Sequence, residues 1–182
     1  MTQRRPWLTA AVFVVTLACG IAQLLHRPLY DVVVRDPARI NDGQWYRLVT
    51  AMFFQDGWAA GLITNLILLA VLGSVAERVF GRGRWLVLYF GCGLFGQLMS
   101  YLWLNPVGAG NSMCCAGLLG ALAYVALRPP AGLAVQPHLR IMAIAVPVLA
   151  VVGTVLHDNH GLPALLGILL AFLMRQKLSV AP

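Results

Sequence analysis

The stretch GAGNSMCCAGLLGALAYVAL, residues 108–127, decides the fold that this chain is predicted to adopt. From Ser112 to Leu127 it is an uncharged apolar run, and small, flexible residues introduce it. A helix that crosses the hydrocarbon core of a bilayer needs about 20 residues. The run is shorter than that, which predicts a helix that begins inside a protein-lined cavity or lies in a thinned part of the bilayer.

Apolar runs of this kind make up much of the chain. Of its 182 residues, 60% are hydrophobic and only 10% are charged, and the mean hydropathy is +0.79. A soluble domain carries about 25% charged residues. The sequence therefore predicts an all-α, polytopic membrane protein that forms one domain over residues 1–182. Six membrane-spanning helices are expected, at residues 7–25, 57–76, 85–104, 112–127, 141–156 and 161–174.

The first apolar run, residues 7–25, follows a basic N-terminus, so a secretory signal peptide is its main alternative. The run is longer than the apolar core of a typical signal peptide, no A-x-A cleavage site follows it, and further spans come after it. We interpret it as a retained first span.

The positive charges predict how the spans are oriented. The net charge is +7, but the basic residues stand in small groups between apolar runs, which does not favour nucleic-acid binding. Nine lie on one side of the predicted bilayer and four on the other: Arg4, Arg5, Arg78, Arg82, Arg84, Arg128, Arg140, Arg175 and Lys177 against Arg27, Arg35, Arg39 and Arg47. By the positive-inside rule the nine mark the cytoplasm. Both termini are then expected to be cytoplasmic, in a bacterial inner membrane.

The cysteines indicate packing rather than chemistry. Cys19, Cys92, Cys114 and Cys115 all lie within apolar runs. Their spacing fits neither a metal site nor a disulfide framework, so they are predicted to be small packing residues. No metal or other cofactor is expected.

Ser112 is the first candidate for chemistry. Serines in membrane helices mostly form hydrogen bonds to their own helix or help helices pack, and such a structural role is the ordinary alternative for Ser112. Its place at a helix start is distinctive, because unpaired backbone amides and the positive end of the helix dipole gather there. Gly108 and Gly110 add backbone freedom to the preceding turn. Such a position would stabilise an oxyanion formed during acyl transfer.

His160, at the start of the sixth predicted span, is the second candidate. An ionisable side chain at membrane depth usually faces a partner or a water-filled cavity. His157 is a rival nearer the surface, and an interfacial histidine held by Asp158 or by water is the ordinary alternative. Small residues recur on both helices: Ser112, Ala116 and Gly120 on one, Gly161, Ala164 and Gly167 on the other. Close packing of these faces is predicted to bring Ser112 beside His160, whose neutral imidazole would take the hydroxyl proton.

Asn65 is the strongly polar side chain within the second predicted span. It either forms a hydrogen bond between helices, worth about 0.6 to 2 kcal/mol in membranes, or donates to an oxyanion. Loss of one oxyanion donor costs about 3 to 4 kcal/mol of barrier. The residue alone leaves both interpretations open.

An ordered set of motifs resembles the rhomboid family of intramembrane serine proteases over residues 44–174. The set comprises WYRLVTAMF (45–53), Asn65, LGSVAERVFG (72–81), GNS (110–112) and NHGLPALLG (159–167). The resemblance implies a six-helix bundle whose fourth span begins with a serine in a Gly-x-Ser-Gly motif and whose sixth span carries a histidine. Trp45 and Arg47 look like the family's structural tryptophan–arginine element. The implied substrate is a transmembrane protein within the lipid bilayer.

Carried over to this chain, the resemblance makes Ser112 the nucleophile and His160 the base of a Ser–His dyad. Gly110 and Asn111 match the motif positions before the serine. The backbone amide of Ser112 and the side chain of Asn65 are the implied oxyanion donors.

Two positions depart from the family pattern. Met113 stands where rhomboids usually have glycine, which bears on the close approach of a substrate backbone. Gly61 stands where they often have a histidine, so one oxyanion donor is missing. Asp158 is given no catalytic role, because on a continuous helix it would lie on a different face from His160.

The leading hypothesis is therefore an intramembrane serine endopeptidase that cleaves single-span membrane proteins near the outer membrane face. The alternative is a proteolytically inactive rhomboid relative that binds transmembrane segments as an adaptor. Met113 and Gly61 favour the adaptor, whereas the joint presence of Ser112 and His160 argues against it. A small transporter or channel is a third hypothesis, but the spans show few of the charges or helix breaks that it needs.

Overall fold

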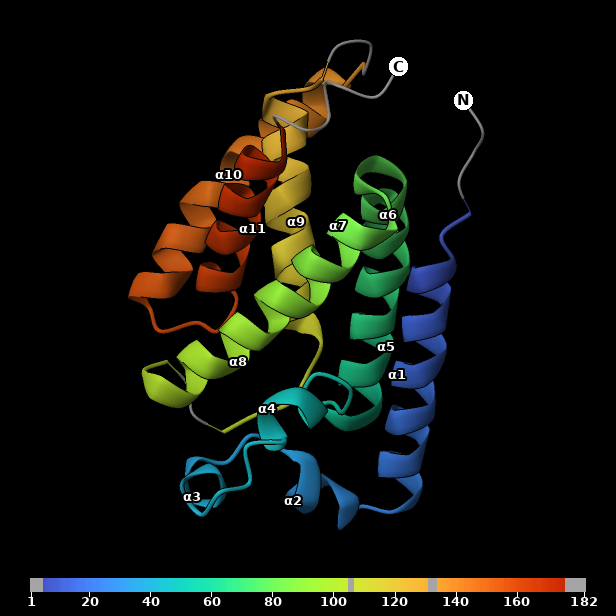
Figure 1. The fold of residues 1–182 in the computed structure, drawn as a ribbon, viewed down its shortest axis with the longest axis vertical. Helices are drawn as coiled ribbons and strands as arrows, with labels where there is room; N and C mark the ends of the chain where they lie inside the picture. The colour runs from blue at the N-terminus through green and yellow to red at the C-terminus, as the bar shows by residue number, and fades with distance from the viewer. Residues whose placement is uncertain (1–4, 105–106, 131–133, 176–182) are drawn as a thin grey trace.

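The computed structural model describes residues 5–104, 107–130 and 134–175, and these form a helical bundle (Figure 1). Four helices are long and apolar enough to cross a membrane: α1 (Trp7–Leu25), Trp58–Phe80, Arg82–Leu102 and α10 (Pro137–Val155). Two shorter apolar helices, α9 (Ser112–Leu127) and α11 (Gly161–Arg175), complete the set. The predicted all-α membrane fold is confirmed. Arg4, Lys177 and the start of the NPVGAGN turn lie outside the described residues.

The second and third spans are continuous helices that each contain one wider, π-helical turn. The second consists of α5 (Trp58–Leu68), a π turn at Leu69–Gly73 and α6 (Ser74–Phe80). The third consists of α7 (Arg82–Leu86), a π turn at Val87–Gly91 and α8 (Cys92–Leu102). The indole Nε1 of Trp85 donates to the carbonyl of Gly73 at 3.0 Å, which joins the two spans where the first π turn ends.

Several helices begin or end at other residues than expected, and a glycine or a proline accounts for the difference. The second span continues to Phe80 rather than residue 76, and the third begins at Arg82 rather than residue 85, because the chain reverses only at Gly81, whose φ is +75°. The fifth begins at Pro137 rather than residue 141, since proline is well tolerated in the first turn of a helix.

The first loop, residues 26–56, contains three short helices: α2 (Leu29–Val33), α3 (Pro37–Asn41) and α4 (Arg47–Thr50). The buried Arg47 donates to the carbonyls of Asp31 and Val34, each at 2.9 Å, and to the side chain of Gln44 at 2.7 Å. One guanidinium therefore holds the loop together, in keeping with the structural role implied for this residue.

Helix α9 lies in the middle of the bundle, between the α10–α11 pair and the helices α5 and α8 (Figure 1). Its 16 residues extend about 24 Å, less than the roughly 30 Å of hydrocarbon in a bilayer. Its first residue lies at the end of the bundle that also carries the first loop and the turn from α10 to α11. The polar segments singled out in the sequence therefore meet at one end.

Candidate active site

Ser112 is the first residue of α9, and the turn before it fixes its position. Gly110 has a φ of +152°, which residues with a side chain rarely adopt. Its amide donates to the carbonyl of Ala51 at 2.7 Å, so the turn is tied to the first loop. Because Cys115 donates the first bond of the helix, to the carbonyl of Asn111 at 3.0 Å, the amide of Ser112 has no acceptor within the helix.

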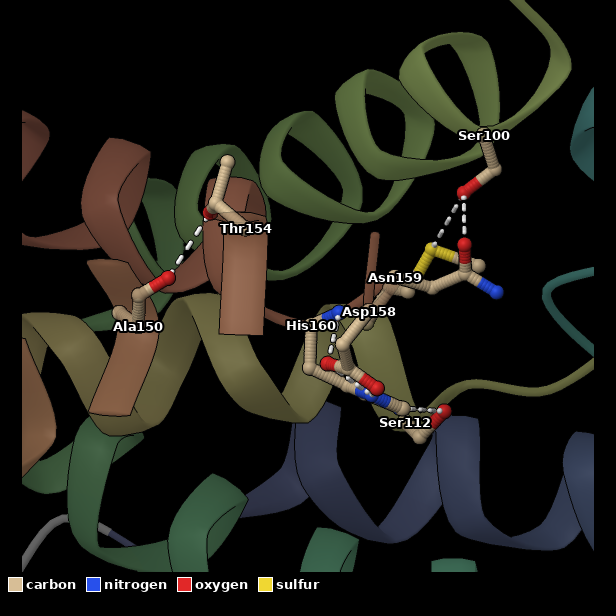
Figure 2. A network of polar contacts seen from close by, with 8 residues as sticks. Ser100, Ser112, Ala150, Thr154, Asp158, Asn159 and His160 are labelled. Atoms are coloured by element: carbon tan, nitrogen blue, oxygen red, sulfur yellow. Dashed lines mark hydrogen bonds and ion pairs between the residues drawn. The ribbon is translucent and has the colours of Figure 1, made fainter. Parts of the chain in front are cut away.

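The side chain of Ser112 meets that of His160 (Figure 2). Its Oγ lies 2.9 Å from Nε2 of the imidazole, within the normal range of a hydrogen bond. His160 belongs to the turn before α11, and its side chain is 47% exposed. The structure thus brings together the two side chains that were expected to meet.

Glycines, which have no side chain, explain why α9 and α11 approach so closely. A Cβ atom built on Gly120 would lie 2.0 Å from the carbonyl oxygen of Ala164. One built on Gly167 would lie 2.0 Å from the carbonyl oxygen of Gly117. Ala116 packs in the same interface, against Ala164. The two backbones are therefore in direct contact, as the small residues predicted.

Gly161 departs from that prediction, because it faces α10 instead of α9. A Cβ atom at this position would lie 2.3 Å from both the carbonyl oxygen of Ala150 and the hydroxyl oxygen of Thr154. Its role is to let α11 begin directly against the preceding helix. The start of α11, and with it His160, is fixed by α10 as well as by α9.

Asn65 lies on α5 and is oriented by a chain of buried amides. Its Nδ2 donates to Oε1 of Gln55 at 2.6 Å, and Nε2 of Gln55 donates to Oδ1 of Asn111 at 3.1 Å. Nδ2 of Asn111 in turn donates to the hydroxyl of Tyr89 at 3.1 Å. An amide nitrogen carries two N–H groups, so the bond to Gln55 uses one and leaves the other available. Gln55 was not predicted; its only signal was a lone glutamine after an apolar run.

A cavity of about 230 Å³ connects these groups. Residues from the first loop, from α5, from the turn before α9 and from the turn before α11 form its wall: Arg35, Asp56, Asn65, Gly108, Ala109, Ser112, Met113, Asn159 and His160. The predicted nucleophile, base and oxyanion donor thus border one space. None of the elements forms that space alone.

Arg35 supplies a buried positive charge to the cavity wall. The residue is inaccessible to solvent, and its guanidinium donates to the side chain of Gln97 on α8. Its backbone pairs with that of Gly108 through bonds of 3.0 and 3.1 Å. Burial lowers the pKa of Arg35 to about 10, and the carboxylate of Asp56 opposes this shift. The guanidinium therefore remains charged at neutral pH, and sequence reasoning had assigned it only to topology.

Asp56 holds the turn before Ser112 through hydrogen bonds to the backbone of Ala109. The backbone amide of Ala109 donates to its Oδ2 at 3.0 Å, and its own amide donates to the carbonyl of Ala109 at 3.0 Å. The hydroxyl of Tyr30 donates to the other carboxylate oxygen. The turn is therefore fastened to the first loop at several points.

Both departures from the rhomboid pattern have a structural counterpart. Met113 is buried and packs against α8, where its sulfur lies 3.8 Å from the hydroxyl of Ser100. It fills space left by Gly96, since a Cβ atom there would lie 2.8 Å from the same sulfur. A Cβ atom on Gly61 would lie 1.8 Å from the carbonyl oxygen of Asp56, so a histidine does not fit at that position.

Asp158 contacts His160, as in the ordinary alternative given for this histidine. Its carboxylate oxygens lie 3.0 and 3.2 Å from Nδ1 of the imidazole. Because α11 begins only at Gly161, both residues belong to a turn, and the argument from helix faces that gave Asp158 no catalytic role does not apply. The rival histidine, His157, packs its ring against Trp103 at a centroid distance of 5.3 Å and does not border the cavity.

Comparison with known proteins identifies the family of this chain. The family model described as the Rhomboid domain matches residues 42–178. Among curated relatives, "Rhomboid protease GluP" of Bacillus subtilis (strain 168) is 37% identical over 93 residues, which are 51% of this chain and 18% of that protein. "Putative rhomboid protease YdcA" of the same organism is 28% identical over 178 residues, which are 91% of this chain and 88% of that protein. This multi-pass membrane protein therefore belongs to the rhomboid family.

Proposed function

We propose that the chain is an intramembrane serine endopeptidase that cleaves transmembrane proteins near the outer face of the membrane. The observation that carries this proposal is the 2.9 Å contact between Oγ of Ser112 and Nε2 of His160, at the edge of a polar cavity. A nucleophile and a base within hydrogen-bond reach are what acyl transfer by serine requires. Membership of a family whose relatives are named proteases supports the same activity.

The bond-making and proton-transfer steps use these two side chains and water. Oγ of Ser112 attacks the carbonyl carbon of the scissile peptide bond while Nε2 of His160 takes its proton. The tetrahedral intermediate collapses when the imidazolium gives that proton to the leaving amine, which leaves an ester on Ser112. A water molecule, deprotonated by the same imidazole, then hydrolyses the ester and restores both side chains.

Two donors are available to the oxyanion of the intermediate. The amide of Ser112 is at the start of α9, where the helix dipole also favours negative charge. Asn65 borders the same cavity, and its amide has a second N–H besides the one bonded to Gln55. Because Gln55 fixes the orientation of the Asn65 amide in advance, little reorganisation is needed when charge develops.

The cavity also restricts the form of the substrate. An α-helix with its side chains is about 10–12 Å across, so a cavity of about 230 Å³ accepts an unwound segment rather than an intact helix. Helical hydrogen bonds shield peptide carbonyls, and local unwinding exposes them. We therefore expect single-span substrates that unwind easily near the bilayer surface.

The proposed orientation follows from charge and topology. The beginning of α1 and the end of α11 lie at the end of the bundle opposite Ser112 (Figure 1). The basic residues are concentrated at that end, which by the positive-inside rule is cytoplasmic. Both termini are then cytoplasmic, cleavage takes place near the outer face, and a bacterial inner membrane is the proposed location.

A fluorophosphonate probe tests the proposal directly. The probe is expected to label the protein in detergent or bilayers, with the modification on the peptide that contains Ser112 when the product is digested and analysed by mass spectrometry. A wild-type protein that binds transmembrane peptides but takes up no label would instead be the inactive adaptor.

Replacement of Asn65 with alanine tests the oxyanion role. We expect kcat for reporter cleavage to fall by roughly 10²- to 10³-fold with a much smaller change in KM, because the donor acts on charge that exists only in the transition state. Thr64→Ala is the matched control, since Thr64 is the neighbouring residue of α5 and is exposed on another face. Equal kcat for Asn65→Ala and Thr64→Ala would show that Asn65 only joins helices.

A further inference from the structure

Asp158 is the carboxylate that faces the imidazole on the side away from Ser112 (Figure 2). Its Oδ1 and Oδ2 lie 3.0 and 3.2 Å from Nδ1 of His160, while Nε2 of the same ring lies 2.9 Å from Oγ of Ser112. Serine, histidine and aspartate are thus aligned through the two nitrogens of one ring. We propose that Asp158 is a positioning residue that completes a Ser–His–Asp triad, where the family resemblance implied a dyad. This inference rests on the proposed protease function.

The contact selects the useful tautomer of the imidazole. A carboxylate only accepts hydrogen bonds, so the Nδ1 that faces Asp158 carries the proton. The lone pair is then on Nε2, directed at the hydroxyl of Ser112, where a general base needs it. When Nε2 takes up the serine proton, the carboxylate stabilises the imidazolium.

The backbone holds Asp158 in this position independently of the imidazole. Its Oδ1 also accepts the backbone amide of His160 at 2.8 Å, and its own amide donates to the carbonyl of Gly153 at 2.8 Å. His157, just before it, has a φ of +60°, which is uncommon for a residue with a side chain. The turn therefore presents the carboxylate in one orientation.

Neighbouring helices fix the rest of the turn. The hydroxyl of Ser100 on α8 donates to the side chain of Asn159 at 2.9 Å, and Gly161 lies directly against α10. Two helices, α8 and α10, thus help to fix the spacing between Asp158 and His160. A surface ion pair formed by chance would not be held at both ends of its turn.

Solvent limits the size of the effect. The side chains of His160 and Asp158 are 47% and 49% exposed, so water screens their interaction. The charged groups that line the cavity are Arg35 from the first loop and Asp56 before α5, and α9 contributes the uncharged Ser112 and Met113. Asp158 is the carboxylate in contact with the ring, so its removal is expected to slow proton transfer by the base.

Asp158→Asn removes the negative charge but keeps the turn, because an asparagine oxygen still accepts a hydrogen bond from the backbone amide of His160. We expect the rate of fluorophosphonate labelling and kcat for reporter cleavage to fall roughly 10- to 100-fold, below the full contribution of a general base. We also expect KM to stay near the wild-type value, because the carboxylate acts on the imidazole and not on the bound substrate. Asp42→Asn, at an exposed aspartate of the first loop, is expected to keep the wild-type labelling rate and kcat.

The outcomes separate the two proposals. An unlabelled wild type overturns the protease function and the positioning role with it. A labelled wild type whose Asp158→Asn variant has the same labelling rate and the same kcat overturns the positioning role alone. Thermal unfolding is measured in parallel; if the asparagine variant unfolds early, Asp158→Ser, which also caps the turn without a charge, replaces it and is judged by the same two readouts.

Discussion

Cleavage of a reporter membrane protein is expected to fall by about three orders of magnitude or more when Ser112 is replaced with alanine. The substitution removes one oxygen atom, the one that lies 2.9 Å from Nε2 of His160. The backbone amide at position 112 remains, so binding and part of the oxyanion stabilisation persist while the covalent step is lost. The measurement is the initial rate of appearance of the cleaved reporter in proteoliposomes.

The controls decide whether this loss is specific. Ser74→Ala removes a serine from α6, at the far end of the bundle, and is expected to cleave at the wild-type rate. His160→Ala is expected to lose about as much activity as Ser112→Ala, and the double variant no more than either, because the two side chains act as a unit. Cleavage by Ser112→Ala at the rate of Ser74→Ala would remove the proposed function.

Gly167→Ala is expected to lower the free energy of unfolding by about 3 kcal/mol, the upper part of the usual range for overpacking. The added methyl group would lie 2.0 Å from the carbonyl oxygen of Gly117. The atoms that it would meet all belong to the backbone of Gly117, so the strain is relieved only if α11 moves away from α9. Activity is expected to fall with stability, since the same movement separates His160 from Ser112.

Gly91→Ala is the matched control for this packing prediction. Gly91 also lies within a membrane helix, but a Cβ atom there meets its nearest neighbour, the side chain of Val87, at an ordinary 3.9 Å. Unfolding of both variants in mixed micelles of dodecyl sulfate and a mild detergent gives the difference. Equal stabilities would mean that α9 and α11 are not in contact in the folded protein.

The sequence predicted the parts of the fold that depend on hydrophobic length and on small residues. Long apolar runs favour helices in any tertiary context, so apolar helices lie where they were predicted, although several of their ends differ. Glycines at helical spacing predicted the close packing of α9 and α11, because a missing side chain is itself the interface. The predicted approach of Ser112 to His160 follows from these contacts.

The residues that were not predicted lie in turns and loops outside the long helices. Asp158 was given no role on an argument that holds only for a continuous helix, whereas it lies in the turn before α11. Gln55 and Arg35 belong to the first loop, whose three-dimensional course no periodicity encodes. Composition is a poor predictor of how much of a polar loop is buried, since the hydrogen bonds of the loop come from several distant segments.

Met113 and Gly96 illustrate a constraint on how such a protein can change over time. The methionine sulfur occupies the space that a side chain at position 96 would need, and the ring of Pro163 borders the same spot at 2.6 Å from a Cβ atom built there. The side chain of Met113 on α9 thus occupies space that Gly96 leaves open on α8. The amino acids tolerated at positions 96 and 113 are therefore coupled: a larger residue at the first becomes acceptable only after a smaller one has appeared at the second, so the order of substitutions matters.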